Sequence, residues 1–194
     1  MPDFDAIVSD AELAIYCIFA AASFLGIAAG SVSGKTSRDV YAKLNKPSWA
    51  PPPWVYGLVW IILYILIGLS FWTARRTVVT VASIPWTTAL FWITNSFFAG
   101  WPRIFFHHRM YGTAAFQIVV SFLLVVGAAI AAGVETYWLP AVLLIPVCLW
   151  VLFAAVLNIV IWRRQATASA SASRPQSGAQ TTIGVAPASF LFPS

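Results

Sequence analysis

Residues 47–74 read PSWAPPPWVYGLVWIILYILIGLSFWTA, a run of 28 positions without an acidic or basic side chain. About 20 apolar residues are enough for an α-helix to cross the hydrocarbon core of a bilayer. Pro51, Pro52 and Pro53 mark the first turn of the helix, because proline is tolerated at a helix start and disrupts a helix interior. The stretch therefore predicts a membrane-spanning helix over residues 52–74.

Four other stretches are also free of Asp, Glu, Lys and Arg. They are residues 13–34, 77–102, 110–134 and 136–162, with lengths of 22, 26, 25 and 27. Each is long enough for one crossing and too short for two. The sequence therefore predicts an all-α membrane protein, a five-transmembrane-helix bundle. Its expected spans are about 13–34, 52–74, 78–102, 111–133 and 137–162.

The composition agrees with a lipid environment. Of 194 residues, 60% are hydrophobic and 9% are charged, whereas roughly a quarter of the residues of a soluble domain are charged. This balance excludes a typical soluble enzyme, a disordered chain and a coiled coil. Cys17 and Cys148 both lie in apolar runs and predict neither a disulfide framework nor a zinc site. The net charge of +5 forms no basic patch interleaved with aromatics, so no nucleic-acid partner is expected.

The placement of charge predicts an orientation. Nine of the 11 basic residues fall on the side of the C-terminus, whereas five of the six acids fall on the side of the N-terminus. The positive-inside rule then places the C-terminus in the cytoplasm and the N-terminus outside. Residues 1–163 are expected to form the membrane domain, with a long first loop at 33–50. Residues 164–194 are small and polar and are expected to be a disordered tail.

The expected spans contain no carboxylate and no amine. Ion-coupled pumps and transporters need such groups inside the bilayer, so this class is not favoured. His107 and His108 lie beside Arg109 and indicate an interfacial basic cluster, with metal binding as the weaker alternative. No metal site and no catalytic triad or carboxylate pair is expected.

An aromatic stripe distinguishes the helix over 52–74. Tyr56, Trp60 and Tyr64 recur at four-residue spacing and share one helix face. Gly57 and Gly68 allow a neighbouring helix or a ligand to approach closely. Taken alone, the stripe fits a helix-packing face at least as well as a binding site.

The segment around this stripe resembles the signature of the TspO/MBR family, the translocator proteins, peripheral benzodiazepine receptors and tryptophan-rich sensory proteins. The family pattern K-P-x-W-x-P-P-x-W-x-x-G-x-x-W-x-x-L-Y-x-x-x-G is matched by Lys46, Pro47, Trp49, Pro51, Pro52, Trp54, Gly57, Trp60, Leu63, Tyr64 and Gly68. Two later segments also agree, at Trp101 with Phe105-Phe106 and at Pro146, Trp150, Phe153, Ala154, Leu157, Asn158, Trp162 and Arg163. The resemblance covers roughly residues 35–163.

The resemblance implies a five-helix bundle, often a homodimer, with a pocket that opens toward the first loop. It implies membrane lipid as the surroundings, and protoporphyrin IX, other tetrapyrroles or apolar drugs as ligands, with no covalent cofactor. The expected location is the mitochondrial outer membrane in a eukaryote or the cell envelope in a bacterium. The ligand-binding residues implied are Trp49, Trp54, Tyr56, Gly57, Trp60, Tyr64, Trp101, Phe105, Trp150, Ala154, Leu157 and Asn158.

Three hypotheses follow for the function. The first is a receptor or carrier for tetrapyrroles that regulates their level or transport. The second is an enzyme that degrades porphyrins in light, with Trp60 and Trp150 as candidate catalytic residues. The third is an interaction module whose aromatic stripe only packs helices; Asn158 likewise has an alternative role as an interhelical hydrogen-bonding group.

Two departures from the family pattern affect these hypotheses. Phe98 stands where the family usually has asparagine, three residues before Trp101. Ile159 stands at the tyrosine position of the family's sterol-binding motif. Cholesterol is therefore a less favoured ligand than porphyrin.

Overall fold

The computed structural model of this chain describes residues 34–77, 84–135 and 138–172. α2 spans Gly34–Lys43 and α3 spans Pro53–Thr77. α4 spans Ile84–Pro102 and passes directly into a π-helical turn, η2, over Arg103–His107. α5 spans Tyr111–Glu135 and α6 spans Trp138–Ala172. The described part of the chain is therefore all-helical, as the sequence predicts.

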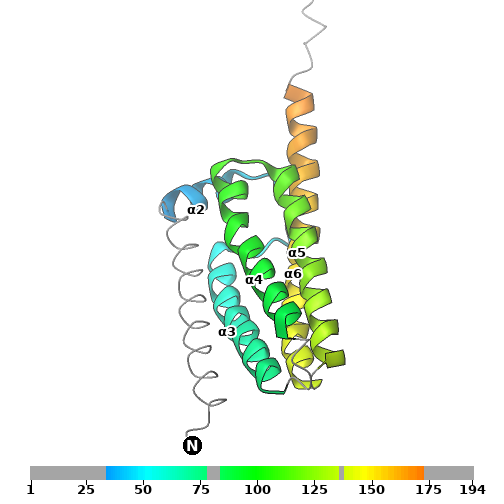
Figure 1. The fold of residues 1–194 in the computed structure, drawn as a ribbon. Helices are drawn as coiled ribbons and strands as arrows, with labels where there is room; N and C mark the ends of the chain where they lie inside the picture. The colour runs from blue at the N-terminus through cyan, green and yellow to red at the C-terminus, as the bar shows by residue number, and fades with distance from the viewer. Residues whose placement is uncertain (1–33, 78–83, 136–137, 173–194) are drawn as a thin grey trace, which may run out of the picture.

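The long helices α3, α4, α5 and α6 run side by side as a bundle, and α2 lies at one end of it (Figure 1). α5 packs against α6 over the most extensive interface, while α3 also packs against α6 and α4 against α5. α3 and α4 contact each other much less. η2 contacts α2, so α2 covers the end of the bundle at which α4 gives way to η2.

The outward faces of the long helices are apolar. Large exposed hydrophobic side chains include Ile61 and Ile65 on α3, Phe116 and Leu123 on α5, and Leu149 on α6. A helix of a water-soluble protein presents polar residues on this face. An apolar exterior of this extent fits contact with lipid. Among the described residues, three helices are long and apolar enough to cross a membrane, at Pro53–Ala74, Tyr111–Val134 and Trp138–Ser171.

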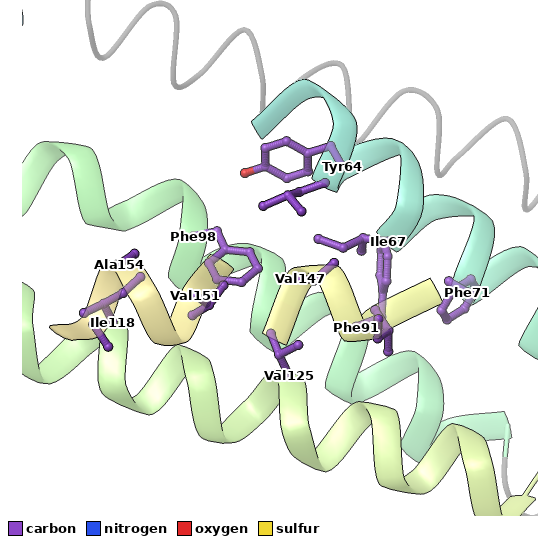
Figure 2. Close-up of a cluster of buried hydrophobic side chains, with 13 residues drawn as sticks. Tyr64, Ile67, Phe71, Phe91, Phe98, Ile118, Val125, Val147, Val151 and Ala154 are labelled. Carbon is purple, nitrogen blue, oxygen red and sulfur yellow. The ribbon is translucent and has the colours of Figure 1, made fainter. Parts of the chain in front are cut away.

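The core of the bundle combines small and branched aliphatic residues with aromatic rings from the facing helices. Ala114, Val147 and Val151 are fully buried. Figure 2 shows Val147 and Val151 of α6 beside Val125 of α5, with the rings of Phe98 and Phe91 from α4 alongside. Small residues at helix interfaces let backbones approach closely, which is the main source of packing energy inside a bilayer.

The first loop contains a helix that the sequence interpretation did not include. Within residues 33–50, expected as a loop, Val40 and Tyr41 of α2 are buried, and so is Leu44, which directly follows the helix. Residues at i, i+1 and i+4 lie on one side of a helix, so the segment has an apolar face to place against the bundle. This packing explains why a segment of modest length is helical.

The end of α6 corrects the expected start of the disordered tail. Disorder was expected from residue 164, but α6 continues to Ala172. Alanine is the best helix former, and the Ser and Thr hydroxyls here are satisfied within the helix. Thr167 Oγ1 donates to the carbonyl of Arg163 and Ser169 Oγ to that of Gln165, both at 3.0 Å. The expected first span over 13–34 lies outside the described residues apart from its last position, as does the start of the third span, 78–83.

Candidate functional site

A cavity of about 330 Å³ lies at the end of the bundle that α2 covers. Its volume falls at the lower end of the range of about 300–1,000 Å³ that is typical of small-molecule sites. Every described helix contributes to its wall. The lining residues are Ser37, Arg38, Tyr41, Pro53, Tyr56, Gly57, Trp60, Tyr64, Phe98, Trp101, Pro102, Phe105, Phe106, Ile118, Trp150, Ala154, Leu157, Asn158 and Ile161.

The structure brings ten of the twelve residues expected from the sequence to this one cavity. They are Tyr56, Gly57, Trp60 and Tyr64 on α3, Trp101 on α4, Phe105 on η2, and Trp150, Ala154, Leu157 and Asn158 on α6. Residues separated by about a hundred positions in the chain therefore line the same cavity. The packing of α3 against α6 brings the residues of these two helices together.

The wall contributed by α3 is the aromatic stripe. The rings of Trp60 and Tyr64 lie 5.6 Å apart between centroids. Trp60 also contacts Phe98 of α4 edge-on, at 5.0 Å. The stripe therefore has two functions at once, because it packs against α4 through Phe98 while its remaining surface faces the cavity.

Trp150 belongs to the part of the wall that α6 contributes. Its ring lies 5.9 Å from Tyr56 and 5.3 Å from Phe153 between centroids. The Trp150 indole nitrogen Nε1 is buried and has no hydrogen-bond partner among the described residues. The Tyr64 hydroxyl is also buried and also has no hydrogen-bond partner among the described residues. A buried donor without a partner costs about 1–3 kcal/mol, so both groups favour a ligand that brings an acceptor.

A π-helical turn places the third group of aromatic residues. Trp101 stacks on Phe105 with a centroid distance of 4.7 Å and an interplanar angle of 27°. Trp101 lies in the last turn of α4 and Phe105 in the π-turn that follows it. Phe105 is buried and its ring supports the Trp101 ring at the cavity.

Asn158 links α6 to α4. Trp101 Nε1 donates to Asn158 Oδ1 at 3.2 Å, and Asn158 Nδ2 donates to the carbonyl of Ala154 at 2.8 Å. Asn158 is 4% exposed, so its amide is largely committed to these two bonds. This is the interhelical role that the sequence interpretation left as the alternative, and it fixes the plane of the Trp101 ring.

Tyr41 fastens α2 over the cavity. Its hydroxyl donates to the carbonyl of Pro51 at 2.7 Å and lies 3.1 Å from the Tyr56 hydroxyl. Since Tyr41 gives its proton to Pro51, Tyr56 is the donor of the second bond. Burial raises the pKa of Tyr41, an effect that the bond from Tyr56 partly offsets. Tyr41 therefore stays neutral at physiological pH and joins α2 to α3.

Trp49 and Trp54 lie outside the cavity, although both belong to the family signature. Trp54 is 68% exposed. It precedes Tyr56 by two positions, which places it about 200° away around α3, on the outward face. Trp49 lies before the helix, is 48% exposed and contacts Phe153 edge-on at 5.8 Å. Of the expected ligand residues, these two therefore lie at the surface and beside α6 and do not line the cavity.

Sequence reasoning missed several lining residues, above all Ser37, Arg38 and Tyr41 of α2. Their spacing of three and four positions was the available signal, because such residues share one helix face. Phe98 was noted only as a departure from the family pattern, yet it lines the cavity. Across the described ranges, no group of three or more His, Cys, Asp or Glu side chains could hold a metal ion.

Comparison with known proteins assigns the family. The model of the TspO/MBR family matches residues 17–163. The chain is 38% identical over 158 residues to the human translocator protein, an alignment that covers 75% of this chain and 86% of the human protein. It is 32% identical over 126 residues to the protein CrtK of Rhodobacter capsulatus, with 63% of this chain and 76% of CrtK covered. It is 30% identical over 138 residues to the tryptophan-rich protein TspO of Chlorobaculum tepidum, with 71% of this chain and 86% of that protein covered. Because the family model matches well over half of its length, this chain belongs to the TspO/MBR family of integral membrane proteins.

Proposed function

We propose that this protein is a membrane receptor or carrier for tetrapyrroles such as protoporphyrin IX, and that it regulates their level or transport. The observation that carries the proposal is the cavity of about 330 Å³, whose lining includes the rings of Trp60 and Tyr64 from α3 and of Trp150 from α6. A flat aromatic ligand stacks on such ring faces. The names of the relatives, translocator and tryptophan-rich protein, are compatible with this role.

The polar groups of the cavity support a ligand with hydrogen-bond acceptors. Trp150 Nε1 and the Tyr64 hydroxyl are buried in the wall without partners among the described residues. A purely hydrocarbon ligand would leave both groups unsatisfied. A ligand with an aromatic body and oxygen or nitrogen acceptors suits the cavity better. A sterol has one hydroxyl oxygen and no aromatic face, so it suits the cavity less well, in line with Ile159 at the tyrosine position of the sterol motif.

The proposal includes the arrangement of the chain in the membrane. We take the five stretches without charged residues as five spans, with the N-terminus outside and the C-terminus in the cytoplasm. Residues 1–163 then form the membrane domain, and the residues after it form the tail. Lipid is the surrounding partner, and association into a homodimer is part of this proposal. The orientation is tested by chemical labelling of a cysteine introduced in the tail of the full-length protein in sealed vesicles, which reports the side of the membrane on which the tail lies.

Titration with protoporphyrin IX tests the ligand assignment directly. The full-length protein in a neutral detergent is titrated while tryptophan quenching and porphyrin absorbance are followed. The Trp60→Ala, Trp150→Ala double variant removes two aromatic walls and is expected to weaken binding by about tenfold or more. Trp54→Ala is the matched control, because Trp54 lies on the outward face of the same helix. Equal affinity of the double variant and the wild type would refute the site.

Light-dependent degradation of porphyrins is the second candidate function. It is favoured by the fact that two indole rings, Trp60 and Trp150, line the same cavity. An electron-rich indole next to a photoexcited macrocycle can take part in its oxidation by oxygen. The distinguishing measurement is the appearance of a new absorbing product under light and oxygen in the wild type. Retention of this product in the Trp60→Phe, Trp150→Phe double variant would argue against a catalytic role of these two indoles.

A further inference from the structure

We propose that Arg38 is the specificity-determining residue of the cavity and binds a carboxylate of the ligand at its α2 end, so that tetrapyrrole acids are preferred to their neutral esters. This inference rests on the proposed function. It narrows the ligand class from flat aromatic molecules to those that carry an anionic group on one edge. Protoporphyrin IX has this form, since both of its propionates lie on one edge of the macrocycle.

The charge pattern of the lining is the first support. Arg38 is the one charged residue among the residues that line the cavity, and no described carboxylate lines it. Asp39, its neighbour in the chain, is exposed and does not line the cavity. The other polar side chains of the wall are uncharged hydroxyls, indoles and the Asn158 amide. The cavity therefore pairs an apolar body with a single positive group.

The position of Arg38 is fixed through Tyr41. Arg38 precedes Tyr41 by three positions, so the two side chains share one face of α2. Tyr41 is bonded to Pro51 and Tyr56, and the Lys46 ammonium donates to the Tyr41 carbonyl at 3.1 Å. α2 is thus attached to the start of α3 and to the segment before it. These bonds hold α2 against the bundle, and Arg38 is therefore held at the cavity.

The other cations at this end of the bundle are placed differently. Lys46 lies over the Tyr41 ring, 5.0 Å from its centroid, and donates to carbonyls of α2. Arg164 Nη1 donates to the Lys46 carbonyl at 3.2 Å. Arg103 is exposed on η2 and does not line the cavity. No described acid forms an ion pair with Arg38, whose guanidinium can therefore bind a ligand carboxylate through two parallel bonds.

The two ends of the site predict how the ligand lies. The macrocycle would lie between Trp60 and Trp150, and its carboxylate edge would face α2. Because Arg38 is exposed, the ion pair is partly screened by water, and a gain of about two- to fivefold in affinity is expected. The gain in affinity should shrink when salt is added, because the Debye length falls from about 10 Å at 0.1 M ionic strength to about 3 Å at 1 M.

A comparison of four affinities tests the inference. Full-length wild type and Arg38→Gln are each titrated with protoporphyrin IX and with its dimethyl ester in a neutral detergent. The ratio of acid to ester affinity in the wild type, divided by the same ratio in the variant, isolates the interaction of Arg38 with the carboxylates. Partition of the two porphyrins into detergent cancels in this quotient. Arg103→Gln is the matched control, an exposed arginine at the same end that does not line the cavity.

The outcomes separate this inference from the proposed function. A quotient of about two to five for Arg38→Gln, and of about one for Arg103→Gln, supports the carboxylate site. A quotient of one for both variants, with both porphyrins bound, overturns the inference and leaves the tetrapyrrole site intact. Equal quotients above one overturn it too, because they indicate a general effect of charge. If neither porphyrin binds the wild type, the proposed function itself fails.

Discussion

Replacing Asn158 by leucine tests the polar contact that joins α6 to α4 beside the cavity. The substitution removes the acceptor of the 3.2 Å bond from Trp101 Nε1. Interhelical hydrogen bonds in membrane proteins contribute about 0.6 kcal/mol on average and up to about 1.7 kcal/mol. Leucine has the same branching and the same number of side-chain heavy atoms as asparagine, and its bulkier methyl groups add a modest packing term. The freed indole N–H of Trp101 lines the cavity, which keeps its penalty near the lower end of about 1–3 kcal/mol. We expect a net destabilisation of about 1 kcal/mol.

The measurement is equilibrium unfolding of the full-length protein in mixed micelles, followed by far-UV circular dichroism. The Ser96→Ala variant is the control, because Ser96 Oγ is exposed and donates only to the Trp92 carbonyl of its own helix, at 2.8 Å. It should change the free energy of unfolding by less than about 0.5 kcal/mol. A Trp101→Phe, Asn158→Leu double variant should lose less than the sum of the single variants. If Asn158→Leu is as stable as the wild type, the bond does not hold the two helices together.

Three further predictions concern the interior, the cavity wall and α2. Thr94 is 5% exposed, and its hydroxyl has no partner among the described residues, so Thr94→Val should stabilise the protein by about 1 kcal/mol in the same unfolding assay; a loss of stability would mean that the hydroxyl has a partner after all. A Cβ added to Gly57 or Gly127 would meet no atom within 4 Å, so Ala at either position should raise stability by up to about 1 kcal/mol. Only Gly57→Ala should weaken porphyrin binding, because Gly57 lines the cavity; equal affinities would contradict its place in the wall. The pKa of Tyr41 is raised by folding from its ordinary value of 10.0, so its contribution to stability is full below pH 10 and is lost as the pH rises above that value. Tyr41→Phe should therefore lower the melting temperature at a pH of about 8 and reduce the further fall toward a pH of about 11; identical pH profiles would refute the role of its ionisation.

The parts of the site that could be predicted from the sequence depend on local geometry. The proline-marked start of α3 and the four-residue spacing of Tyr56, Trp60 and Tyr64 are properties of one helix. Helical periodicity therefore predicted that these rings share a face, and the structure has them along one wall of the cavity. The bounds of α3 and α5 lie within three residues of the expected ends for the same reason.

The remaining features depend on contacts between distant segments. Trp54 belongs to the same signature as Trp60, but only the packing of α3 against α6 decides which face is inward. Phe98 differs from the usual family residue, and its place in the wall follows from its contact with Trp60. The π-turn at η2 arises where Pro102 ends α4, and no periodicity in the sequence marks it. α2 is helical because the bundle offers a surface for Tyr41 and Leu44.

The continuity of α6 has a mechanical consequence. The helix carries Trp150 in the cavity wall and extends beyond the neighbouring helices to Ala172 (Figure 1). At 1.5 Å per residue, the 22 positions between these two residues span about 33 Å. A tilt of about 5° around Trp150 would therefore displace Ala172 by about 3 Å. A small change in the direction of α6 at the cavity is therefore amplified along the helix into a larger displacement at its far end.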